Sequence, residues 1–171
     1  MKTITPKTAV WLARAPYEAQ DIKAGQNYTA GKRFLTEHFD FSQTGGVVHG
    51  TSGSIISTLF NRTTGFAIIG KGKGHFTGDV ALGIRGTNMK SGRDWFSNAN
   101  ASLATADNSS AVHSGFQKIF KSIQPALEKQ LAPLLNTNSN GVVHCAGHSL
   151  GGALASLAAI WIKQRFGNRV A

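Results

Sequence analysis

The sequence predicts an α/β fold in which helices flank a mostly parallel sheet. Apolar strand-like runs alternate with helical faces along the second half of the chain, and this alternation is typical of parallel α/β sheets. The chain has 171 residues, of which 41% are hydrophobic and 15% charged, so it can bury a real core without disulfides. We therefore expect one domain over residues 1–171.

The first half of the chain contains the weaker signals. Residues 5–17 carry apolar side chains at mixed spacing and predict a short helix that ends at Pro16. Residues 52–60 and 64–69 are β-branched and apolar between glycine and asparagine residues, which predicts two strands. A Gly-Lys-Gly-Lys-Gly turn follows at 70–74, and it does not indicate a nucleotide site because no Gly-Lys-Ser/Thr sequence comes after it.

The second half of the chain contains the stronger signals. Residues 79–85 form an almost continuous apolar strand. Apolar residues then recur every three or four positions over residues 113–135, which predicts the longest helix, with an interruption at Pro125. Residues 141–146 predict a buried strand, and residues 150–166 predict a second helix.

The chain is strongly basic, with 18 Lys and Arg residues against 8 Asp and Glu residues and a formal net charge of +10. Such a charge suits a nucleic acid, an anionic membrane surface, or part of a protein whose remainder is acidic. The basic residues are scattered rather than grouped, so we expect no nucleic-acid partner. The single cysteine, Cys145, excludes an intrachain disulfide and is expected to be a buried structural thiol.

The N-terminal segment lacks the apolar run of about 7–15 residues that a conventional secretory signal peptide contains. The localisation therefore stays open between the cytoplasm and export by a route that does not use such a signal. No run of about 18 consecutive apolar residues occurs, so we expect no membrane-spanning helix.

Residues 147–152, Gly-His-Ser-Leu-Gly-Gly, join the last predicted strand to the last predicted helix. A strand that runs directly into a helix needs a sharp bend, and flanking glycines keep that bend free of clashes while Ser149 stands at its apex. The N–H of Leu150 is then a free first-turn donor that could bind an oxyanion. Gly151 and Gly152 each destabilise the helix by about 1 kcal/mol relative to alanine. Close packing against the sheet or an approaching substrate would explain why glycine is present at these positions.

Three segments in sequence order resemble the class 3 lipases, the fungal-lipase-like branch of the α/β-hydrolases. They are GHSLGGALASLAA at residues 147–159, DVALGIRGTNMKSGRDWFSNANASL at residues 79–103, and VHSGFQKIF at residues 112–120. The resemblance implies an α/β-hydrolase-type fold and a serine carboxylic ester hydrolase, either a lipase or a phospholipase A, that acts on acyl lipids or phospholipids at a membrane surface. It implies no cofactor and no metal.

The same resemblance assigns roles to individual residues. Ser149 matches the nucleophile of the family, and Thr87 and Leu150 match the two donors of the oxyanion hole. Asp94 and Trp95 match the start of the family's lid, where Asp94 is not expected to be catalytic.

The sequence contains no Asp, Glu or His after Ser149, whereas this fold places the acid and the base of its triad after the serine. His148 is a poor substitute because successive side chains diverge at a sharp bend, and His144 belongs to the buried strand, where a core histidine is expected. We therefore expect the triad Asp and His to lie beyond the present C-terminus, in a C-terminal fragment or second chain that completes the fold. The domain would then be partial, truncated after the helix that follows Ser149. The alternative is a catalytically inert fragment or a module that binds lipid or protein.

Overall fold

The computed structural model describes residues 2–23, 26, 28, 33–42, 47–52, 62–86, 103–105 and 111–171. Within these ranges the elements follow the chain in this order: α1 (Pro6–Glu18), α2 (Arg33–His38), β1 (Phe39–Asp40), β2 (Val47–Ser52), β3 (Arg62–Gly72), η1 (Gly74–Phe76), β4 (Val80–Ile84), β5 (Leu103–Thr105), β6 (Ala111–His113), α4 (Ser114–Asn136), β7 (Val143–Gly147) and α5 (Leu150–Phe166).

The main sheet has the strand order β1-β3-β4-β7, and β2 also pairs with β3. The α/β class is confirmed with one correction, because the described sheet is mixed rather than mostly parallel. β3 runs antiparallel to β1, β2 and β4, and only β4 and β7 are parallel, with Val80 opposite Val143 and Ile84 opposite Gly147. The physical reason is connection length, since residues 73–79 between β3 and β4 form a tight turn, whereas a parallel pair needs a crossover such as α4.

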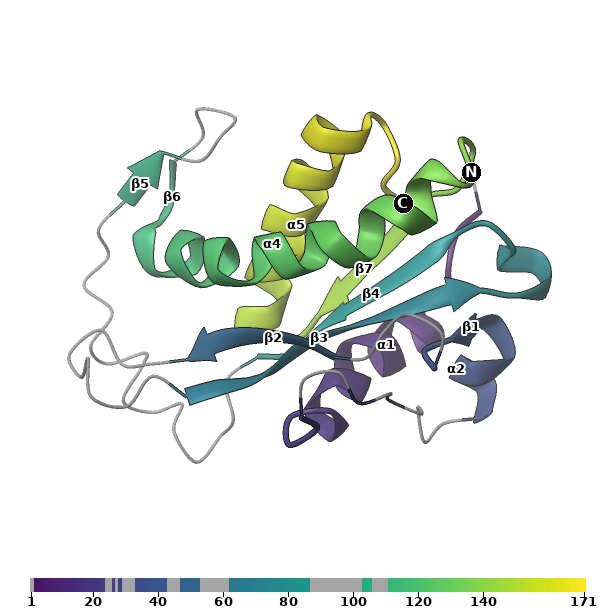
Figure 1. Ribbon diagram of the computed structural model, residues 1–171, viewed down its shortest axis with the longest axis horizontal. Coiled ribbons are helices and arrows are strands. Elements are labelled where there is room, and N and C mark those ends of the chain that lie inside the picture. The colour runs from purple at the N-terminus through teal and green to yellow at the C-terminus, as the bar shows by residue number, and fades with distance from the viewer. Residues whose placement is uncertain are drawn as a thin grey trace.

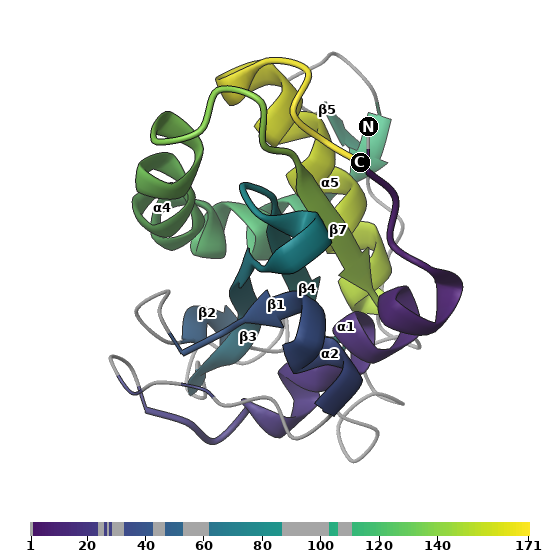
Figure 2. The ribbon, with the colours of Figure 1, turned by 90° about the vertical axis from the view of Figure 1, so that its right-hand side faces the viewer.

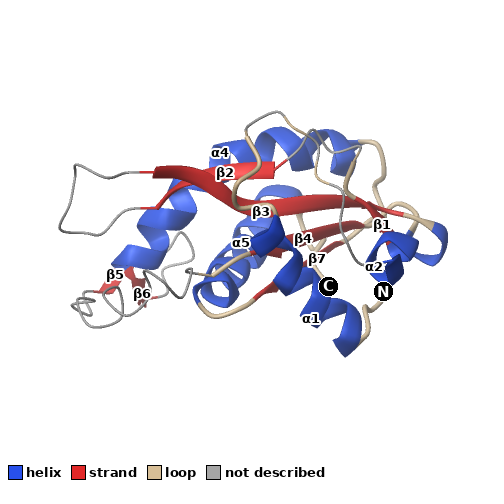
Figure 3. Cartoon of the chain, turned by 90° about the horizontal axis from the view of Figure 1, so that it is seen from below, coloured by secondary structure: helices blue, strands red, loops and turns tan. Residues whose placement is uncertain are grey.

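Helices cover both faces of this sheet. α4 and α5 pack on one face, while α1 and α2 lie on the other (Figures 1 and 2). The two ends of the chain lie close to each other (Figures 2 and 3). Each face has its own hydrophobic core, and a fully buried Leu or Ile side chain stabilises the fold by about 1.5–3 kcal/mol. The core under α4 and α5 includes Leu82, Ile84, Ile123, Leu127, Leu131, Leu154 and Ile162, and the core under α1 and α2 includes Leu12, Leu35, Phe39, Phe41 and Ile68.

α1 continues through Pro16, so the expected end of this helix at Pro16 is wrong. The helix starts at an N-cap, where the Thr5 hydroxyl accepts the Thr8 N–H at 3.2 Å, and Pro6 occupies the first turn. The second half of the helix packs closely on Gly83 of β4. The Pro16 ring and the Leu12 carbonyl occupy the space that a side chain at Gly83 would need. This packing holds the last turn in place without a Pro16 N–H.

α4 is likewise continuous through Pro125, so the expected interruption is not observed. Its buried residues keep the helical spacing on both sides of the proline: Phe120, Ile123, Leu127, Leu131 and Leu135. The apolar stripe outweighs the hydrogen bond that the proline removes.

The strand predictions have mixed outcomes. β3 confirms the predicted strand at 64–69 and extends it to Gly72, so the turn begins later than expected, at the 3-10 helix of residues 74–76. The strand expected at 52–60 falls mainly outside the described residues, and β2 precedes it. β4, β7 and α5 confirm the strands at 79–85 and 141–146 and the helix at 150–166. Of the helices in the described ranges, none has the length and apolar character needed to cross a membrane.

Candidate active site

Ser149 occupies the bend between β7 and α5 in an unusual backbone conformation, with φ at 57° and ψ at −126°. Among the described residues it is the one non-glycine residue with a positive φ. Such a conformation costs about 1–3 kcal/mol and persists where the surrounding structure enforces it, often at functional sites. The Ser149 side chain is exposed, as a nucleophile requires.

Two glycines make this bend possible because main-chain atoms pack against their Cα atoms. A Cβ atom on Gly147 would lie 2.0 Å from the Gly151 oxygen, and a Cβ atom on Gly151 would lie 2.2 Å from the Ile84 oxygen. The nearest atom to a Cβ on Gly152 lies 3.5 Å away, which is ordinary contact. Close packing therefore explains the first glycine of α5 and does not explain the second.

The first turn of α5 presents one free main-chain donor beside Ser149. The Gly151 N–H donates to the His148 oxygen at 2.9 Å, and the Gly152 N–H donates to the Ser149 oxygen at 2.8 Å. The N–H of Leu150 has no acceptor among the described residues. Because the positive end of the helix dipole lies here, this N–H is suited to bind a developing negative charge.

The segment that follows β4 packs directly against the bend. A Cβ atom on Gly86 would lie 2.5 Å from the His148 oxygen and 3.2 Å from the Ser149 Cβ. Only glycine fits at this position. Thr87 comes next in the sequence and lies outside the described residues, as do Asp94 and Trp95.

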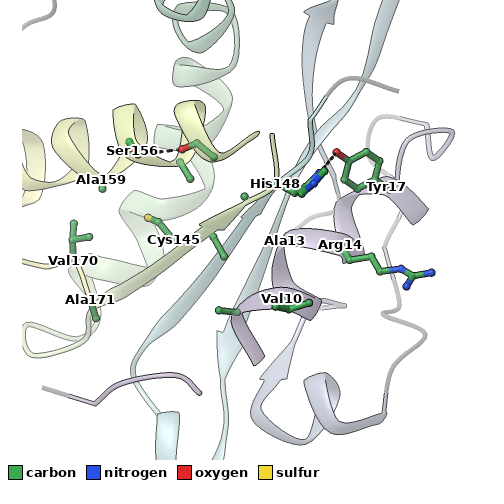
Figure 4. Close-up of a pocket in the computed structure, with 15 residues that line it drawn as sticks. Val10, Ala13, Arg14, Tyr17, Cys145, His148, Ser156, Ala159, Val170 and Ala171 are labelled. Carbon is green, nitrogen blue, oxygen red and sulfur yellow. Dashed lines mark hydrogen bonds between the residues drawn. The ribbon is translucent and has the colours of Figure 1, made fainter. Parts of the chain in front are cut away.

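Tyr17 of α1 joins these two segments. Its hydroxyl accepts the Gly86 N–H at 2.9 Å and lies 3.2 Å from His148 Nδ1, which Figure 4 marks with a dashed line. One side chain thus fixes both Gly86, two residues after β4, and His148, the residue before Ser149. No motif in the sequence predicts this role of Tyr17.

Arg85 holds Gly86 through a second contact. Its side chain is 4% exposed, its Nη1 donates to the Gly86 oxygen at 2.8 Å, and its Cζ lies 4.6 Å from the centre of the Phe66 ring. Burial lowers the pKa of the guanidinium, while Tyr17 and Asp21 act in the opposite direction. The charge is retained, since arginine stays protonated in proteins.

No histidine in the described part of the chain has a hydrogen bond with the Ser149 hydroxyl. His148 turns toward Tyr17, as expected for side chains that diverge at a sharp bend. His144 is 1% exposed and bonds Asp79 Oδ2 at 3.3 Å near the starts of β4 and β7, at the opposite ends of these strands from Ser149. Its expected role as a core histidine is confirmed.

The environment of His144 and Cys145 suits structure rather than catalysis. Burial lowers the pKa of the His144 imidazole, against the opposing effect of the Asp79 carboxylate. Burial also raises the pKa of the partly buried Cys145 thiol to about 12, so little thiolate forms near neutral pH. In the described ranges no group of three or more His, Cys, Asp or Glu residues is placed to hold a metal ion.

A groove of about 780 Å³ runs along β7 beside the bend (Figure 4). One wall comes from α1 and the other from α5, and the floor is β7. Small apolar residues predominate in its walls, with Arg14, Tyr17 and His148 as larger polar members.

The chain is similar in fold to solved lipases. It aligns with a triacylglycerol lipase described as having a serine-protease triad at its catalytic centre, with 19% identity and a TM-score of 0.64, over 99% of this chain and 62% of that one. It aligns with Rhizomucor miehei triacylglyceride lipase with 18% identity and a TM-score of 0.60, again over 99% of this chain and 62% of that one. A lipase from Penicillium expansum gives 16% identity and a TM-score of 0.59, over 96% and 57%.

These alignments confirm the α/β-hydrolase-type fold expected from the sequence, and the chain spans about 60% of the length of these lipases. No curated protein matches the chain. The model of the family "Lipase (class 3)" matches residues 81–170, which is more than half of the chain and includes both Gly86 and the bend at Ser149. The chain therefore belongs to the class 3 lipase family.

Proposed function

We propose that the protein is a serine carboxylic ester hydrolase of the lipase or phospholipase A type, which acts on acyl lipids. One observation carries the proposal: Ser149 is exposed in a strained bend, with the free N–H of Leu150 on one side and the backbone of Gly86 on the other. This placement supports the assignment of Ser149 as a nucleophile next to an oxyanion hole.

The proposed reaction begins when Ser149 Oγ attacks the ester carbonyl carbon and its proton passes to a general base. The carbonyl oxygen becomes an oxyanion that accepts hydrogen bonds from the N–H groups of Leu150 and Thr87. The carbon–oxygen bond to the leaving group then breaks, the alcohol takes the proton, and the acyl group stays on Ser149. Water adds to this acyl-enzyme in the same way, releases the fatty acid and restores the serine.

Support for Thr87 comes from its neighbour in the sequence. The backbone of Gly86 is fixed beside Ser149 by packing, by Tyr17 and by Arg85. A donor from the residue after Gly86 agrees with the usual origin of the second oxyanion N–H, a loop that follows a neighbouring strand.

The acid and the base belong, in this proposal, to polypeptide that completes the fold beyond residue 171. This sequence has no Asp, Glu or His after Ser149, and in the described part no histidine pairs with it. Loss of a triad base costs on the order of 10⁶ in turnover. We therefore expect the 171-residue chain to be almost inert by itself.

The substrate class rests on the family and on charge. The structural neighbours include triacylglycerol lipases, and the net charge of +10 favours an anionic lipid surface. The competing hypothesis is that the chain is a lipid- or protein-binding module without catalytic activity. It would hold if Ser149 could not be activated.

Imidazole in solution can stand in for the missing base, so it provides a test with the chain as it exists. We expect hydrolysis of p-nitrophenyl butyrate to rise with imidazole concentration more steeply for the wild type than for Ser149→Ala, whose slope reports the reaction of imidazole itself. Equal slopes would support the binding module. Turnover without imidazole within roughly tenfold of ordinary esterases would contradict the missing base.

The substrate class is tested separately. The same comparison with tributyrin emulsions and with vesicles of phosphatidylglycerol distinguishes a lipase from a phospholipase by the released product.

A further inference from the structure

The Tyr17 hydroxyl takes part in two hydrogen bonds, and its single proton decides the direction of each. The oxygen accepts the Gly86 N–H at 2.9 Å and lies 3.2 Å from Nδ1 of His148. Figure 4 shows the hydroxyl and the His148 ring facing each other. A phenol oxygen accepts hydrogen bonds and has one proton to donate. Because the bond with Gly86 uses Tyr17 as the acceptor, the proton is available for His148 Nδ1.

This direction assigns the proton of the His148 ring. A neutral imidazole carries one N–H, and the nitrogen that accepts a hydrogen bond is the bare one. Since Nδ1 accepts from Tyr17, the ring proton is on Nε2. The reverse direction, in which an Nδ1–H donates to Tyr17, would leave the Tyr17 proton without an acceptor among the described residues. The hydrogen-bond network therefore favours the Nε2–H tautomer.

His148 contacts Gly86 twice, once directly and once through Tyr17. A Cβ atom on Gly86 would lie 2.5 Å from the His148 oxygen and 2.6 Å from the Tyr17 hydroxyl oxygen. The main chain of His148 thus touches Gly86, while its side chain reaches Gly86 through the Tyr17 hydroxyl. These contacts form a closed loop of three residues beside Ser149, whose Cβ would lie 3.2 Å from the same added atom.

Both polar main-chain groups of Gly86 are used in holding it. The N–H donates to Tyr17, and the oxygen accepts from Arg85 Nη1 at 2.8 Å. The Gly86 N–H is therefore committed to Tyr17 and is not itself a donor for an oxyanion. Its task is to keep the Gly86 main chain pressed against the bend.

We propose that His148 is a positioning residue for the reaction of Ser149. Its bare Nδ1 accepts the Tyr17 proton, which orients the Tyr17 oxygen toward the Gly86 N–H and holds Gly86 against Ser149. The inference rests on the proposed function and gives a role to the residue that precedes the nucleophile. It also excludes His148 as the general base, since Nδ1 is occupied by Tyr17 and Nε2 already carries a proton.

Nitrogen NMR of the labelled chain tests the proton assignment at about pH 9, above the range in which histidine usually titrates. The signals of His148 are those absent from His148→Asn. We expect Nε2 to have the shift of an N–H nitrogen and Nδ1 that of a hydrogen-bonded bare nitrogen. Tyr17→Phe should move the Nδ1 shift toward that of an unbonded nitrogen, whereas Tyr28→Phe should not. A proton on Nδ1, or an Nδ1 shift that is unchanged in Tyr17→Phe, would overturn the proposal.

Two variants of His148 test the link to Gly86. Leucine and asparagine have nearly the same size and shape, but only asparagine keeps an acceptor close to the position of Nδ1. Hydrogen exchange of the Gly86 amide should be roughly tenfold faster in His148→Leu than in the wild type and close to the wild-type rate in His148→Asn. Circular dichroism verifies that both variants fold. Equal exchange in the wild type and His148→Leu would overturn the proposal.

The effect on Ser149 is measured by its rate of fluorophosphonate labelling. His148→Leu should slow labelling roughly three- to tenfold, and His148→Asn should restore most of the rate. Adding Tyr17→Phe to His148→Leu should slow it little further, because both act through one contact. Equal losses in the two His148 variants, or fully additive losses in the double variant, would overturn the positioning role. An unreactive Ser149 in the wild type, with the expected nitrogen shifts and Gly86 exchange, would instead refute the proposed function.

Discussion

The carbonyl oxygen of Gly151 lies 2.0 Å from the point where a Cβ atom on Gly147 would stand. The last residue of β7 and the first turn of α5 therefore touch through their main chains, and Ser149 between them has no room to adopt an ordinary conformation. The strain at Ser149 follows from this contact and from the similar approach of Gly151 to Ile84. Each is a backbone contact that a single methyl group would break.

Gly147→Ala should lower the free energy of unfolding by about 3 kcal/mol or more, because the added methyl group must displace the first turn of α5. Gly152→Ala is the matched control. Its Cβ would meet nothing nearer than 3.5 Å, so it should raise stability by up to about 1 kcal/mol through helix propensity. Urea unfolding followed by circular dichroism measures both, and a Gly147→Ala variant as stable as the wild type would refute the packing argument.

Tyr17→Phe should loosen the site as well as the fold. It removes the acceptor of the Gly86 N–H and the partner of His148, at a cost of about 1–2 kcal/mol. Tyr28→Phe is the control, because the Tyr28 hydroxyl bonds Ala15 and Glu18 away from the bend. Both variants should lose stability in urea, but only Tyr17→Phe should slow the reaction of Ser149 with a fluorophosphonate. Equal Ser149 reactivity in the two variants would restrict Tyr17 to a role in stability.

Acid should destabilise the protein through His144. Its pKa in the folded chain lies below the ordinary value of 6.5 because of burial, so below that pH the unfolded chain binds more protons than the folded one. The stability that neutral His144 provides is complete above about pH 6.5 and is lost as the pH falls toward the folded pKa.

A substitution isolates this contribution. His144→Gln can still donate to Asp79 and does not titrate, so its unfolding free energy should vary less with pH over this window. Urea titrations between pH 5 and 7.5 supply the comparison; identical slopes for wild type and His144→Gln would contradict the assignment.

The sequence was most informative where one strong local pattern determines an element. The glycine-flanked serine between an apolar run and an alanine-rich helix predicted β7, the bend and α5, and the helix bounds of 150–166 match the structure. The helices around Pro16 and Pro125 were predicted less well. Tertiary packing, on Gly83 for α1 and along the buried stripe for α4, outweighs the local effect of proline, and no local pattern reports such packing.

The sheet and the supports of the site depend on contacts between distant segments. Antiparallel pairing of β3 with β4 follows from the short connection between them. The glycine-rich turn at 70–74 was predicted, but the alternation of strands and helices in the second half of the chain suggested a parallel sheet. Tyr17 is 69 residues from Gly86 and 131 from His148 in sequence. Nothing near Tyr17 in the chain signals that its hydroxyl meets either one. Ser149, by contrast, is recognisable because its own neighbours shape the bend.

The central claim, that Ser149 is a nucleophile placed beside oxyanion donors, is tested most directly by fluorophosphonate labelling of the 171-residue chain followed by peptide mapping. Ser156 is the internal reference, since it is exposed on the same helix and its hydroxyl donates to the Gly152 oxygen at 3.1 Å. Neither serine has a histidine partner among the described residues, so the ratio of rates reports the oxyanion donors. We predict that Ser149 reacts roughly 100-fold faster than Ser156; equal rates at the two serines would contradict the claim.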